Sequence, residues 1–194
     1  MGSTWLKRFF RTLERAEYPE NPWNASQWTR FLGDAVDRVS RQMKCRAAMR
    51  RATTRGDERS GEYLNIDAIY FDGDAYDAQS KAYAAGYDPF VIPRVLVELE
   101  NAADDDRVAY SLWKLLCVRA PLRVLISHRP RCQGVEKLRE HLDAVILGGC
   151  LMKDARGELL VLIGENSAAE EAEWDEYFKV FEWRKGHLRP LEQR

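Results

Sequence analysis

The sequence is poor in the features that mark exported, zinc-binding or membrane-spanning proteins. It has four cysteines in 194 residues, and no two of them have a CxxC or CxxxC spacing, which argues against a zinc knuckle. It has no run of about 18 apolar residues, so we expect no membrane span. Its first residues carry charges where a secretory signal needs an apolar core. We therefore expect a cytoplasmic protein whose thiols are free and at least partly buried.

Histidine is also scarce, with three residues in the chain. His128, His141 and His187 are scattered, and none has a second His or Cys at the spacing of helical metal ligands. We expect no catalytic or metal-binding role for them, and His128, at the end of an apolar strand, is the best placed. A hydrophobic fraction of 45% and a net charge of −1 exclude general disorder, and the length suits one domain over 1–194.

The balanced net charge hides an asymmetry along the chain. Residues 1–59 hold 13 Lys and Arg against 7 Asp and Glu, and the rest of the chain is acidic. The basic groups concentrate in 38–59, which could contact phosphates or form a solvated helix face, and both readings stay open. The candidate nucleic-acid contacts are Arg38, Arg41, Lys44, Arg46, Arg50 and Arg51.

Hydrophobic periodicity predicts helices in the first part of the chain and strands alternating with helices after it. Asp72-Gly73-Asp74 is typical of a turn, Pro121 ends the third helix, and 75–90 has no clear pattern. We expect an α/β fold with a mixed central sheet flanked by helices. The predicted helices cover 4–17, 26–52, about 106–120 and 134–145, and the predicted strands 63–71, 94–100, 122–127, 159–163 and 177–183.

Three acidic residues interrupt apolar strands. Asp67 lies between Ile66 and Ala68, and Glu98 and Glu100 close the second strand. Side chains two apart on a strand share a face, and burying one such charge alone costs several kcal/mol. We expect the three carboxylates to converge on one cleft, where hard oxygen ligands suit Mg²⁺ or Mn²⁺. Alternatively, the two glutamates lie on the solvent face of an edge strand.

The order of these motifs resembles a known superfamily. Asp67 is followed by Val97-Glu98-Leu99-Glu100-Asn101, by a helix with Trp113-Lys114-Leu115, and by Ala120-Pro121 before the next strand. This order is similar to the PD-(D/E)xK nucleases, in uncharacterised bacterial members. The resemblance covers about 58–130 plus a leading helix, and it implies a restriction endonuclease-like core over 60–164. The three-strand meander of that family looks shortened here, because only two strands are predicted before the helix.

The resemblance implies roles for four residues. Asp67 and Glu98 match the two acids of the motif and would ligate Mg²⁺ or Mn²⁺, together with Glu100. Glu100 stands where the family usually has lysine. Either Glu100 fills that position or the lysine has migrated to the next helix as Lys114, which shares a helix face with Arg107 and Ser111. The implied catalytic residues are Asp67, Glu98, Glu100 and Lys114.

The expected function is Mg²⁺-dependent hydrolysis of a nucleic-acid phosphodiester, with DNA as the expected partner and the basic part of 1–59 contacting its backbone. Two alternatives remain open. One is an inactive nuclease-fold module that binds nucleic acid or protein. The other is an interaction domain whose mark would be a solvent-exposed Glu98 and Glu100. A homodimer is compatible with cutting both strands of a duplex. Residues 165–194 are expected to form a C-terminal acidic segment and a strand.

Overall fold

One mixed sheet organises the molecule. The structure is a computed structural model that describes residues 1–17, 25–49, 66–82, 91–129, 134–148, 156–165 and 173–191. Its seven-stranded sheet has the strands in chain order. The strands are β1 (Cys45–Met49), β2 (Ala68–Asp72), β3 (Val95–Glu100), β4 (Leu122–Arg129), β5 (Glu158–Glu165), β6 (Phe178–Arg184) and β7 (His187–Pro190).

The direction of the strands changes across the sheet. The first three strands are antiparallel neighbours, β3, β4 and β5 are parallel, and the last two again pair antiparallel. The parallel centre is the most buried part, and every residue of β4 is buried, as expected for a strand covered on both faces. The prediction of an α/β fold with a mixed central sheet is confirmed.

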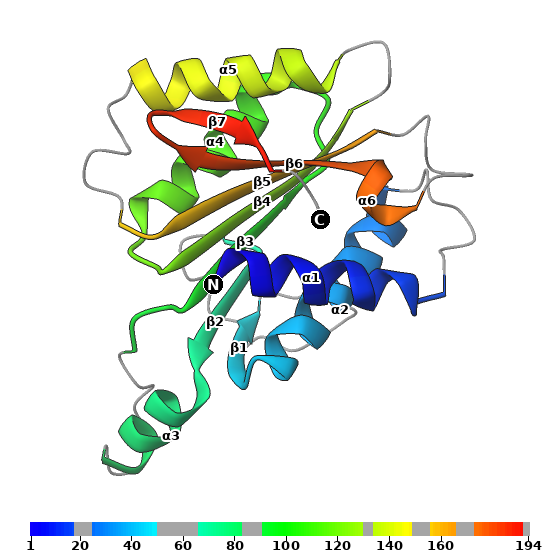
Figure 1. The fold of residues 1–194 in the computed structure, drawn as a ribbon. Coiled ribbons are helices and arrows are strands. Elements are labelled where there is room, and N and C mark those ends of the chain that lie inside the picture. The colour runs from blue at the N-terminus through cyan, green and yellow to red at the C-terminus, as the bar shows by residue number, and fades with distance from the viewer. Residues whose placement is uncertain are drawn as a thin grey trace.

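Helices cover both faces of the sheet (Figure 1). Apolar residues of α1 and α2 pack on one face, and those of α4 and α5 pack on the other. Two hydrophobic cores therefore lie back to back, while α3 projects away from the sheet in Figure 1. The helices are α1 (Gly2–Glu14), α2 (Ala25–Gln42), α3 (Gly73–Ala82), α4 (Asp105–Cys117), α5 (Val135–Gly148) and the short α6 (Trp174–Tyr177).

The predicted helix over 26–52 is too long. The helix ends at Gln42, and residues 45–49 form β1 instead. Its Ala, Arg and Met residues favour a helix intrinsically, but all five residues of β1 pair with β2. Tertiary pairing therefore overrides local propensity. The strand also completes a three-strand antiparallel meander, so the prediction of a shortened meander is wrong. Residues 50–65, including the predicted loop, lie outside the described residues.

The predicted turn at Asp72-Gly73-Asp74 is the start of α3. Asp72 Oδ1 accepts a hydrogen bond from Ala75 N at 3.1 Å, which is the N-cap arrangement. Gly73 donates its N–H to Lys44 O at 3.1 Å, and a Cβ at this position would lie 2.6 Å from the same oxygen. Glycine is therefore required where α3 leaves the sheet beside the turn into β1.

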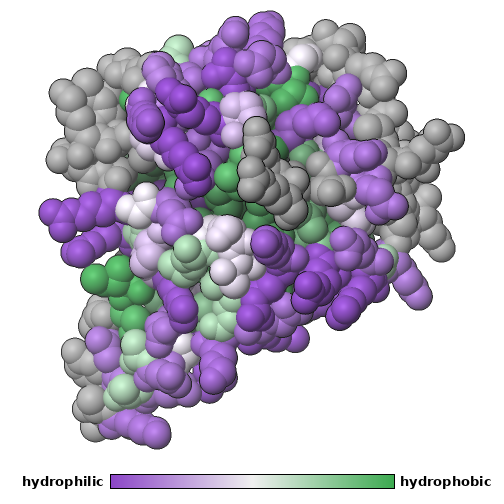
Figure 2. Space-filling view, in the orientation of Figure 1, coloured by the Kyte–Doolittle hydropathy of each residue, from purple (hydrophilic) through white to green (hydrophobic). Residues whose placement is uncertain are grey.

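The other predicted elements are found with shifted ends. The first helix begins at Gly2, α4 has the predicted N-cap region at Asp104, and β4 extends to Arg129. The sequence patterns missed α6 and β7, which are only four residues each. Among the described residues, no helix is long and apolar enough to cross a membrane. Hydrophilic residues cover most of the surface over α1 in Figure 2.

Candidate active site

Asp67 and Glu98 are neighbours across the β2–β3 pair. Ala68 pairs with Val97 in the antiparallel register, so Asp67, one residue earlier, lies beside Glu98. Asp67 Oδ2 accepts a hydrogen bond from Leu99 N at 2.8 Å, which fixes this carboxylate just before the start of β2, rather than inside the strand as the sequence predicted. Strand alternation puts Glu98 on the same face as Leu96, which belongs to the core beneath α4 and α5.

Glu98 is a buried carboxyl group with one cationic partner. Its exposed fraction is 2%, and Lys114 Nζ from α4 lies 2.8 Å from its Oε1. Burial first, and then the charge of Asp67 and a hydrogen bond to it, raise the pKa of Glu98 from 4.5 to about 8, although the neighbouring Lys114 lowers it. Burial beside a second carboxylate therefore disfavours the ionised form of Glu98 more than Lys114 favours it.

Glu100 is held by the segment that follows it and by α4. Its Oε1 accepts a hydrogen bond from Ala102 N at 2.8 Å, and its Oε2 accepts one from Ser111 Oγ at 3.2 Å. Ser111 and Lys114 are three residues apart on α4 and reach the two glutamates that are two apart on β3. The predicted helix face is therefore confirmed for this serine and this lysine, while Arg107 is exposed.

The alternative that the two glutamates lie on the solvent face of an edge strand is wrong. The strand β3 has β2 on one side and β4 on the other. Glu98 is buried and Glu100 is half-buried, because α4 covers this part of the sheet. An interaction domain would expose Glu98 and Glu100 to solvent, and neither residue is exposed in this structure.

The metal-ligand prediction needs a set of converging oxygen donors. Asp67 and Glu98 interact directly, and Glu100 follows on the same face of β3. Among the residues that the structure describes, no group of three or more His, Cys, Asp or Glu side chains is arranged to hold a metal ion. The carboxylates of the site that interact directly are Asp67 and Glu98, with Lys114 beside Glu98.

Sequence reasoning missed an arginine beside this site. Arg129, at the end of β4, is 1% exposed. Its Nη2 binds Asp105 Oδ1 at 2.8 Å, and its Nη1 donates to Ala102 O at 2.9 Å. Arg129 therefore fixes the β3–α4 connection, which supplies the N–H that holds Glu100. The signal was available, because a charged residue ends an apolar strand.

His128 lies on the opposite face of the sheet from Glu98. The indole N–H of Trp28 donates to Nε2 of His128, and Nδ1 lies 2.8 Å from Tyr177 Oη. Burial, followed by the charge of Arg129, lowers the pKa of His128 to about 3. The imidazole is therefore neutral near pH 7 and is part of an aromatic cluster.

The cysteine predictions are confirmed in part. Cys45 and Cys117 are both free thiols. Cys45 is buried, and burial raises its pKa. Cys117 is exposed, because it occupies the last position of α4 rather than the buried face of the helix. Cys132 and Cys150 lie outside the described residues.

The described part of the basic segment is exposed and lies away from the carboxylates. Arg38 and Arg41 lie on α2, Lys44 follows that helix, and Arg46 lies on β1, where it forms an ion pair with Asp77 at 3.1 Å. Lys44 meets the end of β2 opposite to Asp67. Arg50 and Arg51 lie outside the described residues.

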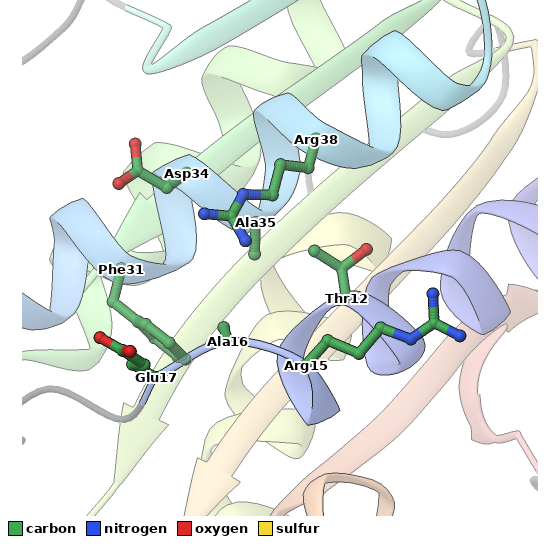
Figure 3. Close-up of a pocket in the computed structure, with 8 residues that line it drawn as sticks. All are labelled: Thr12, Arg15, Ala16, Glu17, Phe31, Asp34, Ala35 and Arg38. Carbon is green, nitrogen blue, oxygen red and sulfur yellow. The ribbon is translucent and has the colours of Figure 1, made fainter.

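A pocket of about 350 Å³ lies between α1 and α2. Figure 3 shows side chains of α2 on one side of it and those of the end of α1 and the residues after it on the other. Two cations and two anions line it, so its charge is balanced and does not select a phosphate. The lining residues are Thr12, Arg15, Ala16, Glu17, Phe31, Asp34, Ala35 and Arg38.

Comparison of the chain with protein-family models, with curated proteins and with solved structures found no match. The class of protein is therefore defined by the geometry alone. It is an α/β domain with a mixed seven-stranded sheet. Its candidate site consists of the half-buried Asp67 just before β2, the buried Glu98 on β3 and Lys114 beside Glu98.

Proposed function

We propose that this protein is a divalent-cation-dependent nuclease of the PD-(D/E)xK type. The element order α2, β1, β2, β3, α4, β4 supports the proposal. It provides a leading helix, a three-strand antiparallel meander, a helix, and a strand parallel to the last strand of the meander. This is the core order that the sequence resemblance implies, and β1, which the sequence pattern missed, completes it.

The observation that carries the proposal is the contact of Lys114 with Glu98 beside Asp67. Lys114 Nζ from α4 lies 2.8 Å from Oε1 of the buried Glu98 on β3, and Asp67, just before β2, interacts with Glu98. A structural core gains little from such a set, because burying a second carboxylate beside the first is unfavourable. The contact supports Lys114 as the migrated lysine and leaves Glu100 as a third carboxylate.

The donor chemistry of the pair fits a divalent cation. Asp67 and Glu98 offer hard carboxylate oxygens, which Mg²⁺ and Mn²⁺ prefer. Burial and the charge of Asp67 raise the pKa of Glu98, so a bound cation would favour the ionised form of Glu98. When bound, the cation supplies charge neutralisation at the phosphate and a lowered pKa of the attacking water.

The protein's own groups have distinct tasks in phosphodiester hydrolysis. The water oxygen forms a bond to phosphorus and gives up a proton to solvent. The bond from phosphorus to the leaving oxygen breaks, and that oxygen takes up a proton from solvent. The Lys114 ammonium offsets negative charge that develops on the phosphate. Asp67 is oriented by Leu99 N, and Glu100 by Ala102 N and Ser111, so little reorganisation is needed.

A second function is supported by a separate observation. Lys114 already neutralises one charge of Glu98, and no group of three metal-ligating side chains is found among the described residues. Both facts are compatible with a nuclease-fold module that binds nucleic acid or protein without cutting it. The two functions differ in whether added Mg²⁺ or Mn²⁺ produces cleavage.

Cleavage of end-labelled DNA and RNA, single-stranded and duplex, with Mg²⁺ or Mn²⁺ tests the proposal. We expect cleavage by the wild type and none by Asp67→Asn or Glu98→Gln. Glu140→Gln, an exposed change on α5, is the matched control and should cut normally.

Lys114→Ala separates the two candidates for the third catalytic position. It should lower the cleavage rate by about 10²–10³. Normal cleavage by Lys114→Ala together with no cleavage by Glu100→Gln would assign the position to Glu100. No cleavage by the wild type on any of the substrates would overturn the nuclease proposal in favour of the binding module.

A further inference from the structure

Two aromatic rings are exposed on the outer face of α4. Tyr110 is 60% exposed and Trp113 is 43% exposed, although large aromatic side chains are usually buried. Their rings stack on each other, with centroids 5.6 Å apart and an interplanar angle of 22°. The opposite face of the same helix is fully packed against the sheet and α5. The packed residues are Val108, Ala109, Leu112, Leu115 and Leu116.

The aromatic pair is continuous with the candidate active site. Lys114 Nζ lies 5.8 Å from the centroid of the Tyr110 ring, within cation–π range, and the same atom is 2.8 Å from Glu98 Oε1. One ammonium group therefore links the exposed Tyr110 ring to the buried Glu98. Arg107, three residues before Tyr110 on the helix, is also exposed.

We propose that Tyr110 and Trp113 form a stacking platform for unpaired bases of a single-stranded nucleic acid whose phosphate is directed to Lys114. The proposal rests on the proposed nuclease function, because it names the substrate class of that site. A nucleotide carries a flat π system and a phosphate joined by a sugar. The α4 surface offers a partner for each: the flat rings of Tyr110 and Trp113 for the base, and the Lys114 ammonium beside them for the phosphate.

Single strands fit this surface better than duplexes do. In a duplex the base faces are covered by neighbouring bases, whereas unpaired bases expose faces that stack on aromatic side chains with little sequence preference. A second copy of the chain would instead have to bury the exposed Arg107 together with the rings. Moving an exposed cation out of water is unfavourable, so a polyanion is the better occupant.

The test is binding without catalysis, measured in EDTA. The probes are end-labelled single-stranded oligothymidylate and oligouridylate and a DNA duplex of the same length, followed by fluorescence anisotropy. We expect the wild type to bind the single strands more tightly than the duplex. The double change Tyr110→Ala with Trp113→Ala should weaken single-strand binding by about tenfold or more. Tyr110→Phe with Trp113→Phe should restore it, because the rings are retained.

Two readouts separate stacking from general effects. Ile92→Ala is the matched control, because Ile92 is 56% exposed but has no ring to stack on a base, and it should bind as the wild type does. The alanine double variant should keep the salt dependence of binding, because it removes no cation. Loss of binding with an unchanged salt slope and an unchanged unfolding transition supports the platform.

The outcomes for the platform and for the nuclease are distinguishable. Single-strand binding that depends on the rings, without cleavage after Mg²⁺ or Mn²⁺ is added, keeps the platform and overturns the nuclease. Cleavage with unchanged binding in the alanine double variant overturns the platform and keeps the nuclease. The platform is also overturned if the wild type binds no single strand, or if the double change only converts a dimer to a monomer in light scattering.

Discussion

Replacing Glu98 with glutamine should stabilise the protein at alkaline pH. Burial and Asp67 raise the pKa of Glu98 from 4.5 to about 8, so the folded state holds this proton more tightly than the unfolded state does. Wild-type stability attributable to Glu98 is fully present below pH 4.5 and is lost as the pH rises through 8. Glutamine keeps a similar shape and never ionises, so the advantage of Glu98→Gln should grow across the same window.

The size of the effect follows from the same pKa. Each tenfold change in proton affinity corresponds to about 1.4 kcal/mol, which gives an upper bound of roughly 5 kcal/mol above pH 8. The variant also loses the ion pair with Lys114, and breaking a buried pair has a cost of similar order. That cost is reduced because the Lys114 side chain is partly exposed and can reach water. We expect a net stabilisation of about 1–3 kcal/mol at pH 9 and little or none at pH 5.

Urea unfolding followed by tryptophan fluorescence measures this difference. The experiment compares wild type, Glu98→Gln and the exposed control Glu140→Gln at several pH values between 5 and 9, in EDTA to remove divalent cations. The control should follow the wild type, because exposed charges contribute little. A difference for Glu98→Gln that does not change with pH, or a variant less stable than the wild type at pH 9, would refute the burial argument.

Three further predictions follow from the described contacts. Lys114→Met should destabilise the protein by about 1–3 kcal/mol at pH 9 but less at pH 5, because it leaves Glu98 without its cation once ionised; urea unfolding at the two pH values checks this. Gly164→Ala should lower the free energy of unfolding by about 1–3 kcal/mol, because the new Cβ would lie 2.5 Å from His128 Nδ1. Gly33→Ala should instead stabilise α2 by about 0.5–1 kcal/mol, because its Cβ would meet only one atom, at 3.9 Å. Thermal unfolding of the two variants compares these effects. Burial lowers the pKa of His128 to about 3, so the contribution of His128 to folding stability is present above pH 6.5 and is lost as the pH falls toward 3. His128→Gln should therefore lose part of the wild type's loss of stability in acid, which a titration of stability against pH measures.

Strands with strong apolar patterns were predictable from the sequence. The runs that form β3, β4 and β5 are continuous and rich in Val, Leu and Ile, which is typical of strands buried on both faces. The N-cap region of α4 was also visible, because Asp104 accepts a hydrogen bond from Asp106 N as its position before the helix suggested.

The elements that failed prediction depend on distant partners. The β1 sequence has helical propensity and becomes a strand only through pairing with β2. The start of α3 requires Gly73 to pass close to Lys44, which lies 29 positions earlier in the printed sequence. No local pattern contains information on such contacts, so these errors have a common cause.

The residues of the candidate site were predictable from the sequence, but the contacts between them were not. Acids inside apolar strands singled out Asp67, Glu98 and Glu100, and helical spacing put Lys114 on a face with Ser111. The partner of each group was not predictable, because it depends on the distance between α4 and β3. Arg129 was missed for the same reason, since its role comes from the β3–α4 connection that it holds.

The most direct test of the nuclease proposal is the Mg²⁺-dependent cleavage rate of end-labelled single-stranded DNA by wild type and Glu98→Gln, purified and assayed side by side. We predict cleavage by the wild type that stops on chelation of the cation, and no cleavage by Glu98→Gln although the variant is folded. Equal cleavage by both proteins would contradict the assignment of Glu98, and no cleavage by the wild type with Mg²⁺ or Mn²⁺ would contradict the nuclease function itself.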